Sequence, residues 1–523
     1  MARKHIPNYV VASVSISLGG LANGLDTGSI GAITAMSQFS ETVGTLSPFL
    51  VGFTVSLIML TGAVPSMLTG YLADKFGRLK LNLAGAVLFG IGVLLQGTAY
   101  SLPHFLFGRA LAGLGEGVFL GNMSVYICEI APAKSRGTLA GLPQFMSTAG
   151  VCIGYFTAYG TVNIDSSMAW RLPYVVQGLC AVMFALTCLV LPESPRWLLL
   201  HGRRADAIRA LEQLEFSTVE AERDFLSNSQ SDQQLSLSPW QSFTLLFRKG
   251  YRARTILALF ILGMVQLSGI DGVIYYAPIL FSRTGLPGET AAFLASGLSA
   301  ILMLAISVPA FLLADKWGRR TSAISGGVGL TGLMLLMGTL YAAGAVHPYG
   351  AARWVVVVAV FAFGLTYCAT WGIVGKIYAS EIQPGNTRAA ANCLATGVSF
   401  SLTRIMQFCN WLVAMITPIL LDKSAFGAYF LFGGLALGTT AVLAAYMPET
   451  RGRSLENIQE AFHRPPLKGI GHYVQRLGPR RRRAAAVPAQ DGVELAPQRS
   501  GASSATGVGD AAPSGMRFDV SAS

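Results

Sequence analysis

Two oppositely charged residues stand inside apolar stretches of this sequence and are the first candidates for chemistry. Asp26 interrupts the stretch 9–32, and Arg109 interrupts the stretch 103–128. A charged side chain at the centre of a membrane-spanning helix costs about 2.5–3.5 kcal/mol on insertion scales, so a carboxylate there must be partnered or protonated. We expect Arg109 to be the partner of Asp26. Protonation of Asp26 would release Arg109 and change which conformer is favoured. A static ion pair that only holds two helices together is the alternative.

A second acidic residue follows Arg109 in the same stretch. Glu116 lies in Gly113-Leu-Gly-Glu-Gly117, where a small or apolar residue is expected. It comes seven residues after Arg109 and therefore lies on the same face of a helix. The pattern leaves three roles open: a second proton site, a further partner for Arg109, and a structural polar contact.

Membrane helices must position these residues, because the composition makes the bilayer the main solvent. Of the 523 residues, 52% are hydrophobic and only 12% are charged, and the mean hydropathy is +0.52. Soluble chains are about one quarter charged, and about twenty apolar residues span a bilayer. We therefore predict an all-α polytopic membrane protein. The twelve expected helices are 9–32, 47–72, 81–100, 103–128, 138–160, 172–191, 254–281, 290–313, 322–345, 353–380, 389–420 and 425–447.

Topology explains the net charge of +12 better than nucleic-acid binding does. Basic residues gather in loops on one side of the twelve-helix arrangement, and the positive-inside rule makes that side, with both termini, cytoplasmic. The first span lacks a small-residue cleavage site after it and is expected to be an uncleaved anchor. All seven cysteines fall inside predicted spans without metal-ligand spacing, which argues against a disulfide framework and against a metal site.

Two polar regions divide the chain. We expect a cytoplasmic N-terminus at 1–8, six helices in 9–191, a cytoplasmic loop at 192–253, six helices in 254–447 and a cytoplasmic tail at 448–523. Periodicity predicts an amphipathic surface helix over 203–225 of the loop. The tail lacks the apolar residues of a core and is expected to be disordered after about residue 463. Its run Arg480–Arg483 indicates contact with anionic lipid.

The two six-helix halves repeat each other, which is visible in three motifs that recur in the same order. A parallel repeat of this kind places a substrate site at the membrane midplane between the halves, where rocking exposes it to each side in turn. The recurring pairs are Asp74-Lys-x-Gly-Arg78 with Asp315-Lys-x-Gly-Arg319, Glu129-Ile-x-Pro-x-x-x-Arg136 with Glu381-Ile-x-Pro-x-x-x-Arg388, and Pro192-Glu-Ser194 with Pro448-Glu-Thr450.

These motifs resemble the sugar porter family of the major facilitator superfamily over residues 9–462. Four further motifs carry the same resemblance: Gly24-Leu-Asp-Thr-Gly28, Gly108-Arg109, Pro192-Glu-Ser-Pro-Arg-Trp-Leu198 and Gln266-Leu-Ser-Gly-Ile270. The pair Trp371-Gly372 resembles that of fungal members of the family. The resemblance implies a transporter of two six-helix bundles in the plasma membrane, monomeric, with no cofactor beyond the proton gradient. Its partners would be a small-molecule substrate, protons and lipid. In proton-coupled members, the acid and the arginine that correspond to Asp26 and Arg109 form the coupling pair.

The same resemblance places Gln144, Gln266, Asp271 and Tyr275 at sugar-contacting positions. Amides and phenols suit this role because they offer hydroxyl groups both donors and acceptors; hydrogen bonding between helices is the alternative. Four positions depart from the family pattern, namely Val265, Asp271, Met303 and Lys376. Asp271 and Lys376 are expected to neutralise each other in one desolvated cavity. The alternatives are contact of Lys376 with an anionic substrate, a misalignment with the family, and another role for Lys376.

Charged residues at the cytoplasmic helix ends form a predicted gate that latches the halves in one state, although topology signals alone are the alternative. They are Asp74, Arg78, Glu129, Arg136, Glu193, Arg196, Asp315, Arg319, Glu381, Arg388, Glu449 and Arg451.

The eleventh predicted span is longer than one membrane crossing requires. An insertion at Ser401–Gln407 is one explanation, and a bent helix that places Arg404 in a polar cavity is the other.

The sequence favours proton-coupled symport of a monosaccharide or polyol. The alternative is a carrier of the same fold that imports or exports a sugar acid, a quinate-like acid or a secondary metabolite, and a non-transporting sugar sensor is a third. An enzyme is not expected, since the chain carries no nucleophile triad, metal constellation or phosphate-binding loop.

Overall fold

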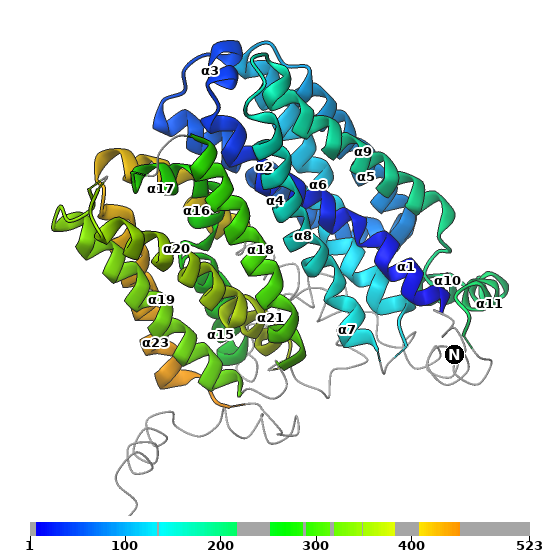
Figure 1. Cartoon of the computed structure of the whole chain (residues 1–523). Helices are drawn as coiled ribbons and strands as arrows, with labels where there is room; N and C mark the ends of the chain where they lie inside the picture. The colour runs from blue at the N-terminus through cyan, green and yellow to red at the C-terminus, as the bar shows by residue number, and fades with distance from the viewer. Residues whose placement is uncertain are drawn as a thin grey trace, which may run out of the picture. The chain divides into compact units, whose positions relative to one another are not determined.

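The computed structural model describes residues 7–132, 135–216, 252–285, 289–313, 318–347, 349–381 and 407–449, and every regular element in these ranges is a helix. Figure 1 shows the arrangement. The helices before the central loop are α1 (Asn8–Ile16), α2 (Leu18–Ala35), α3 (Ser37–Val43), α4 (Pro48–Phe76), α5 (Arg78–Gly97), α6 (Leu102–Ile130), α7 (Arg136–Ala140), α8 (Leu142–Thr161) and α9 (Met168–Val190), followed by α10 (Pro195–Leu200) and α11 (Arg204–Gln213).

The second half of the chain repeats this all-helical pattern. Its helices are α15 (Arg252–Gln266), α16 (Ile270–Tyr275), α17 (Ala277–Arg283), α18 (Glu289–Leu313), α19 (Arg319–Ala342), α20 (Ala352–Ala369), α21 (Trp371–Glu381) and α23 (Gly427–Tyr446), with residues 407–423 also helical.

Eight helices in the described ranges are long and apolar enough to cross a membrane. They are Pro48–Phe76, Arg78–Gly97, Leu102–Ile130, Met168–Val190, Thr255–Tyr275, Arg319–Ala342, Ala352–Gly375 and Gly427–Tyr446. Three of the other predicted spans are helical as well, and the described part of the eleventh, 407–420, is also helical. The first is divided into α1 and α2 at Ser17, the fifth is α8 and the eighth is α18. The prediction of an all-α, multi-span fold is confirmed.

Two predictions about helix bounds have different outcomes: the structure contradicts one and leaves the other untested. The surface helix predicted for 203–225 begins as α11, but it ends at Gln213, because Glu215 takes a left-handed conformation with φ 62° that breaks the helical hydrogen bonding. This end of the prediction is therefore wrong. The question of an insertion at Ser401–Gln407 falls on residues that, apart from Gln407, lie outside the described ranges.

Each half has its own apolar core. The first core includes the edge-to-face rings of Phe39, Phe105 and Trp170, whose centroids lie 5.2 and 5.3 Å from that of Phe39. The second includes Phe363, Trp371 and Tyr378, all fully buried or nearly so. Aromatic pairs in this geometry contribute beyond their buried area, so each bundle has a packed interior in which charged groups are desolvated.

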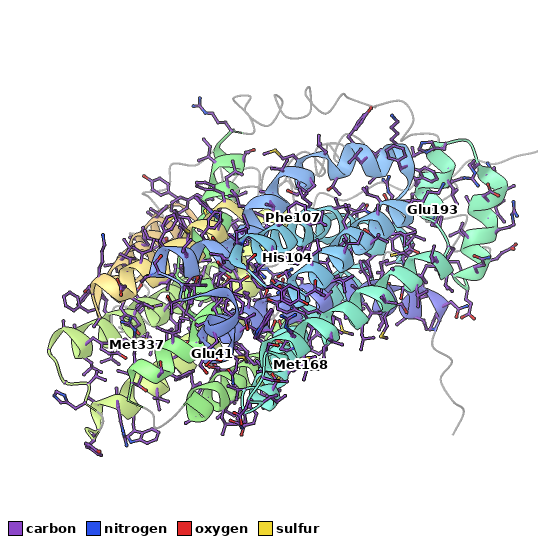
Figure 2. The ribbon with its side chains drawn as sticks, turned by 90° about the horizontal axis from the view of Figure 1, so that it is seen from above. Glu41, His104, Phe107, Met168, Glu193 and Met337 are labelled. Carbon is purple, nitrogen blue, oxygen red and sulfur yellow. The ribbon has the colours of Figure 1, made fainter. Side chains whose placement is uncertain are left out.

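The helices also define two ends of the first bundle. Met168 begins α9 and Glu193 follows its last turn, and Figure 2 shows them at opposite ends of the bundle, with Glu41 near Met168. In Figure 1, α7, α10 and α11 lie at the same end of the first bundle as Glu193, and α3 lies at the opposite end of that bundle.

Candidate functional site

Asp26 and Arg109 form a two-pronged ion pair in the first bundle. Arg109 Nη1 donates to Asp26 Oδ1 at 3.0 Å, and Nη2 donates to Oδ2 at 3.2 Å. Asp26 is 2% exposed and Arg109 is 0% exposed. Paired donors aligned on both carboxylate oxygens are the strongest arrangement for such a pair. The structure therefore brings together the two residues that the sequence proposed as partners.

Arg109 also binds two further helices. Its Nη1 lies 3.3 Å from Oε1 of Gln96 on α5, and its Nη2 donates to the carbonyl oxygen of Val55 on α4 at 3.0 Å. The Nε atom is buried and has no hydrogen-bond partner among the described residues. One guanidinium group thus joins α2, α4, α5 and α6. A change in the charge of Asp26 acts on the packing of all four helices.

Glu116 does not join this ion pair. Asn23 Nδ2 donates to Glu116 Oε1 at 2.5 Å, and Asn23 Oδ1 accepts a hydrogen bond of 2.9 Å from Ser147 Oγ on α8. The second oxygen, Oε2, is buried and has no hydrogen-bond partner in the described part of the chain. Among the three roles left open by the sequence, a direct partner of Arg109 does not match these contacts, since Glu116 binds α2 instead.

In the second bundle, a polar cluster surrounds Gln266. Its Nε2 donates to Asn410 Oδ1 and lies 3.5 Å from Asp271 Oδ2, while Tyr367 donates its hydroxyl to Gln266 Oε1 at 3.0 Å. The structure therefore brings Gln266 and Asp271 together, as the resemblance implied. Sequence reasoning missed Asn410 and Tyr367. The sequence offered one signal that could have found them, since an amide and a phenol stand out inside predicted apolar spans.

The two bundles meet beside this cluster. The hydroxyl groups of Thr27 on α2 and Tyr275 on α16 lie 3.4 Å apart, and the hydroxyl of Tyr155 on α8 donates to the carbonyl of Ile274. Gln144 lies on α8, one turn before Ser147, and its side chain is exposed. Polar groups of α2, α8 and α16 therefore gather at the junction of the halves.

The structure describes the side chains of three of the four residues that depart from the family pattern. Val265 and Met303 are buried in the second core. The side chain of Lys376 lies outside the described part of the chain, so its pairing with Asp271 stays a prediction.

The predicted gate begins with Arg78 at the start of α5. Its Nη2 and Nε donate to the two oxygens of Glu129 at 2.9 and 3.0 Å, and its Nη1 lies 2.8 Å from Asp74. Glu193 accepts the backbone N–H groups of Arg78 and Leu79 at 3.0 and 3.2 Å. Burial raises the pKa of the Glu193 carboxyl, and these N–H donors oppose that shift.

The second half repeats this end of the bundle in three dimensions. Glu449 accepts the backbone N–H groups of Arg319 and Arg320 at 2.8 and 3.1 Å, at the start of α19. Tyr126 donates to Pro192 O at 2.6 Å, and the equivalent Tyr378 donates to Pro448 O at 3.3 Å. The motif repeats seen in the sequence are therefore matched by equivalent contacts.

Five predicted gate residues fall outside what the structure describes, entirely or in their side chains. Asp315, Arg388 and Arg451 lie outside the described residues, as do the side chains of Arg136 and Glu381. Arg196 lies on α10.

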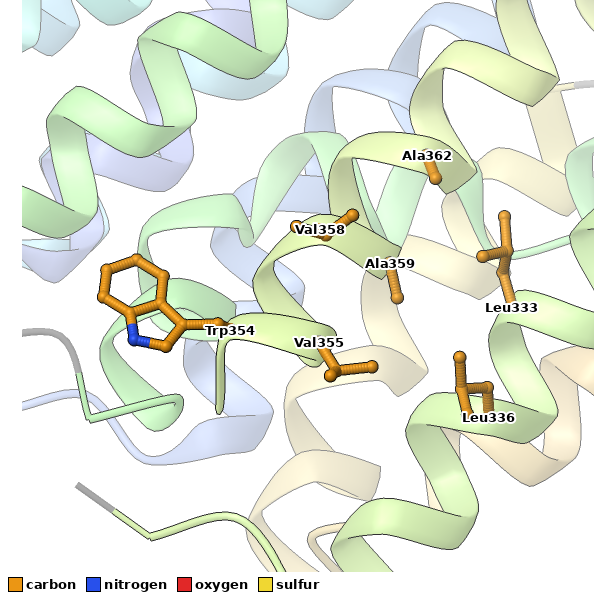
Figure 3. Close-up of a pocket in the computed structure, with 7 residues that line it drawn as sticks. All are labelled: Leu333, Leu336, Trp354, Val355, Val358, Ala359 and Ala362. Atoms are coloured by element: carbon orange, nitrogen blue, oxygen red, sulfur yellow. The ribbon is translucent and has the colours of Figure 1, made fainter. Parts of the chain in front are cut away.

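A groove of about 340 Å³ between α19 and α20 is a different kind of feature (Figure 3). Its lining side chains are aliphatic apart from Trp354, and several of them face outward. It offers almost no hydrogen-bonding groups to a hydroxylated substrate. The lining residues are Leu333, Leu336, Trp354, Val355, Val358, Ala359 and Ala362.

Comparison with known proteins supports the architecture. A family model described as "Sugar (and other) transporter" matches residues 12–462. The arabinose-proton symporter of Bacillus subtilis (strain 168) is 29% identical over 469 residues, covering 88% of this chain and 97% of the relative. The MFS-type transporter criB of Aspergillus cristatus is 29% identical over 458 residues, covering 87% and 92%. The inward-open xylose transporter XylE from E. coli superposes with a TM-score of 0.70 at 23% identity, covering 86% of this chain and 99% of that chain. At this identity the superposition establishes a shared fold.

Proposed function

This chain belongs to the sugar (and other) transporter family, and from that premise we propose that it is a proton-coupled symporter of a monosaccharide or related polyol. The protein is a multi-pass membrane transporter of the major facilitator fold rather than an enzyme. Alternating access between the two bundles would carry the substrate across the membrane.

One observation carries the proposal: the buried ion pair between Asp26 and Arg109, which links four helices. With Asp26 ionised, the pair holds α2 against α6. A proton on Asp26 removes the charge that Arg109 binds and weakens this link, so the conformational equilibrium depends on the proton. The similarity to an arabinose-proton symporter supports the same coupling.

The proposed substrate site lies at the junction of the bundles. Gln266, Asp271 and Tyr275, with Gln144 on the facing α8, supply donors and acceptors for hydroxyl groups. We add Asn410 and Tyr367, because both bind Gln266 directly. A substrate that displaces these contacts must replace them.

The contact between Asp271 and Gln266 bears on the alternative, an organic acid as substrate. A carboxylate within the cluster repels an anion unless a cation neutralises it. Lys376 is our candidate for that cation. Neutralisation by Lys376 leaves the cavity suited to a neutral polyol.

Several finer features belong to the same proposal. The charged residues at the cytoplasmic helix ends would latch the two halves together in one state of the cycle and separate in the other. The protein would act as a monomer in the plasma membrane, with both termini cytoplasmic and the proton gradient as its energy source. A fungal source stays a prediction, since a fungal relative accompanies bacterial and plant ones.

Uptake of radiolabelled sugars in transporter-deficient cells, with and without a protonophore, tests this function. We expect accumulation of at least one monosaccharide or polyol, and we expect the protonophore to abolish accumulation above the external concentration. Accumulation that is insensitive to the protonophore would contradict symport. A lack of uptake across the whole sugar panel would favour the organic-acid alternative.

A further inference from the structure

The middle of the first bundle, away from the helix ends, holds more acid than base. Among the described residues of that bundle, the buried charged side chains are Asp26, Arg78, Arg109 and Glu116. Arg78 lies at a helix end and is already bound by Glu129 and by Asp74. Two carboxyl groups therefore face a single guanidinium group, Arg109, in the middle of the bundle.

The contacts of Glu116 suit a protonated carboxyl in this structure. It is 8% exposed, its Oε1 accepts one hydrogen bond from the neutral amide of Asn23, and Oε2 has no hydrogen-bond partner among the described residues. No ion pair of Glu116 is present in that part of the chain. An ionised carboxylate with one neutral donor is costly in a dry interior. A proton on Glu116 removes this cost while Asp26 holds Arg109.

The position of Glu116 lets it replace Asp26 electrostatically. It lies two helical turns beyond Arg109 on α6, about 10 Å along the axis. Asn23, which binds Glu116, is on α2 three residues before Asp26 and therefore on the same face. The titratable residues of α4 and α5 are confined to positions 71–80, at the far ends of those helices. The second bundle brings the phenols of Tyr275 and Tyr276 to this region, and α9 brings the phenol of Tyr174.

We propose that Asp26 and Glu116 hold one transported proton jointly. In the proton-loaded carrier, the proton first occupies Glu116 while the pair of Asp26 and Arg109 is intact. It then passes to Asp26, which releases Arg109, and the Glu116 carboxylate balances the freed guanidinium. Loss of the proton from Asp26 to the other side leaves both acids ionised and resets the carrier. One proton enters and one leaves in each cycle. Asp26, Arg109 and Glu116 together carry no net charge in both loaded forms, because one of the two acids is always protonated.

This inference rests on the proposed symport and is tested first by the pH dependence of sugar uptake. In Glu116→Gln, nothing balances Arg109 when Asp26 is protonated. We expect half-maximal uptake to require about tenfold more protons, a shift of about one pH unit to lower pH. The matched control is Glu41→Gln, because Glu41 is exposed on α3, and it should match the wild type. A Glu116→Gln profile that coincides with the wild-type profile overturns the proposal.

A second measurement does not depend on transport. Infrared absorption of the purified wild-type protein near neutral pH should contain the protonated carboxyl of Glu116. In Asp26→Asn, Glu116 should ionise to balance Arg109, so this absorption should disappear although Asp26 itself was not protonated. Equal absorption in both proteins, or none in the wild type, overturns the proposal. Failure of symport is recognised separately, by wild-type accumulation that resists a protonophore.

Discussion

At the scale of single residues, the buried pair of Asp26 and Arg109 decides how a proton could act on this protein. The guanidinium binds the carboxylate with two donors and reaches a carbonyl and an amide on two other helices. Breaking such a pair by removing one partner costs about 3–5 kcal/mol. The energy available from protonating Asp26 is therefore large enough to reverse a conformational preference of a few kcal/mol.

Asp26→Asn should separate accumulation from exchange. Asparagine has the shape of a protonated aspartic acid but cannot release a proton, so the variant should lose accumulation against a gradient while sugar exchange between the two sides continues. Uptake and counterflow in vesicles measure the two activities. Asp206→Asn, on the surface helix α11, is the control and should behave as wild type. Normal accumulation by Asp26→Asn would show that the pair is only structural.

At the scale of elements, α2 is the helix that connects the proton site to the second bundle. Its buried face carries Asp26, and Thr27 on the adjoining face meets Tyr275 of α16. Gly31 lies one turn further on and packs directly against the end of α16, since a Cβ atom there would overlap the carbonyl of Tyr275. Backbone cannot move aside as cheaply as the end of a side chain can, so this contact requires glycine.

Gly31→Ala should therefore prevent the close approach of α2 and α16 and reduce uptake at least tenfold. Gly121→Ala on α6 is the matched control, since a Cβ atom there meets nothing within 4 Å, and alanine in an open helical position should raise stability by up to about 1 kcal/mol. Uptake rates, corrected for the amount of protein in the membrane, measure the effect. Similar uptake by Gly31→Ala and wild type would mean that the contact is not needed for transport.

At the scale of the whole molecule, the internal repeat is carried by hydrogen bonds as well as by sequence. Glu193 and Glu449 each accept two backbone N–H groups at the start of a helix, α5 in one half and α19 in the other. Carboxylates at helix N-termini stabilise them by satisfying free N–H donors and by favourable interaction with the helix dipole. The two halves therefore use one device at equivalent positions.

Glu193→Ala and Glu449→Ala should each lower stability, by about 0.5–2 kcal/mol, because each leaves two helix donors without their acceptor. Thermal unfolding of the purified protein in detergent measures both, with Glu41→Ala as an exposed control. A loss in only one of the two variants would contradict the equivalence of the halves.

The sequence by itself determined the spans, the duplication and the identity of the central pair. Bilayer thickness sets the length of an apolar span, and this length can be recognised from consecutive residues alone, so most predicted spans appear as helices. Asp26 and Arg109 stood out because a charged side chain inside such a span is costly. The predicted end of the surface helix at residue 225 was wrong, because α11 ends at Gln213 and periodicity does not signal the left-handed Glu215.

Only the tertiary structure decided which polar groups meet. Glu116 binds Asn23 rather than Arg109, and Asn410 and Tyr367 complete the cluster around Gln266. Such contacts depend on how each helix is rotated and shifted against its neighbours. Membrane helices are apolar on most faces, so their local pattern fixes the span but leaves rotation to close packing between helices.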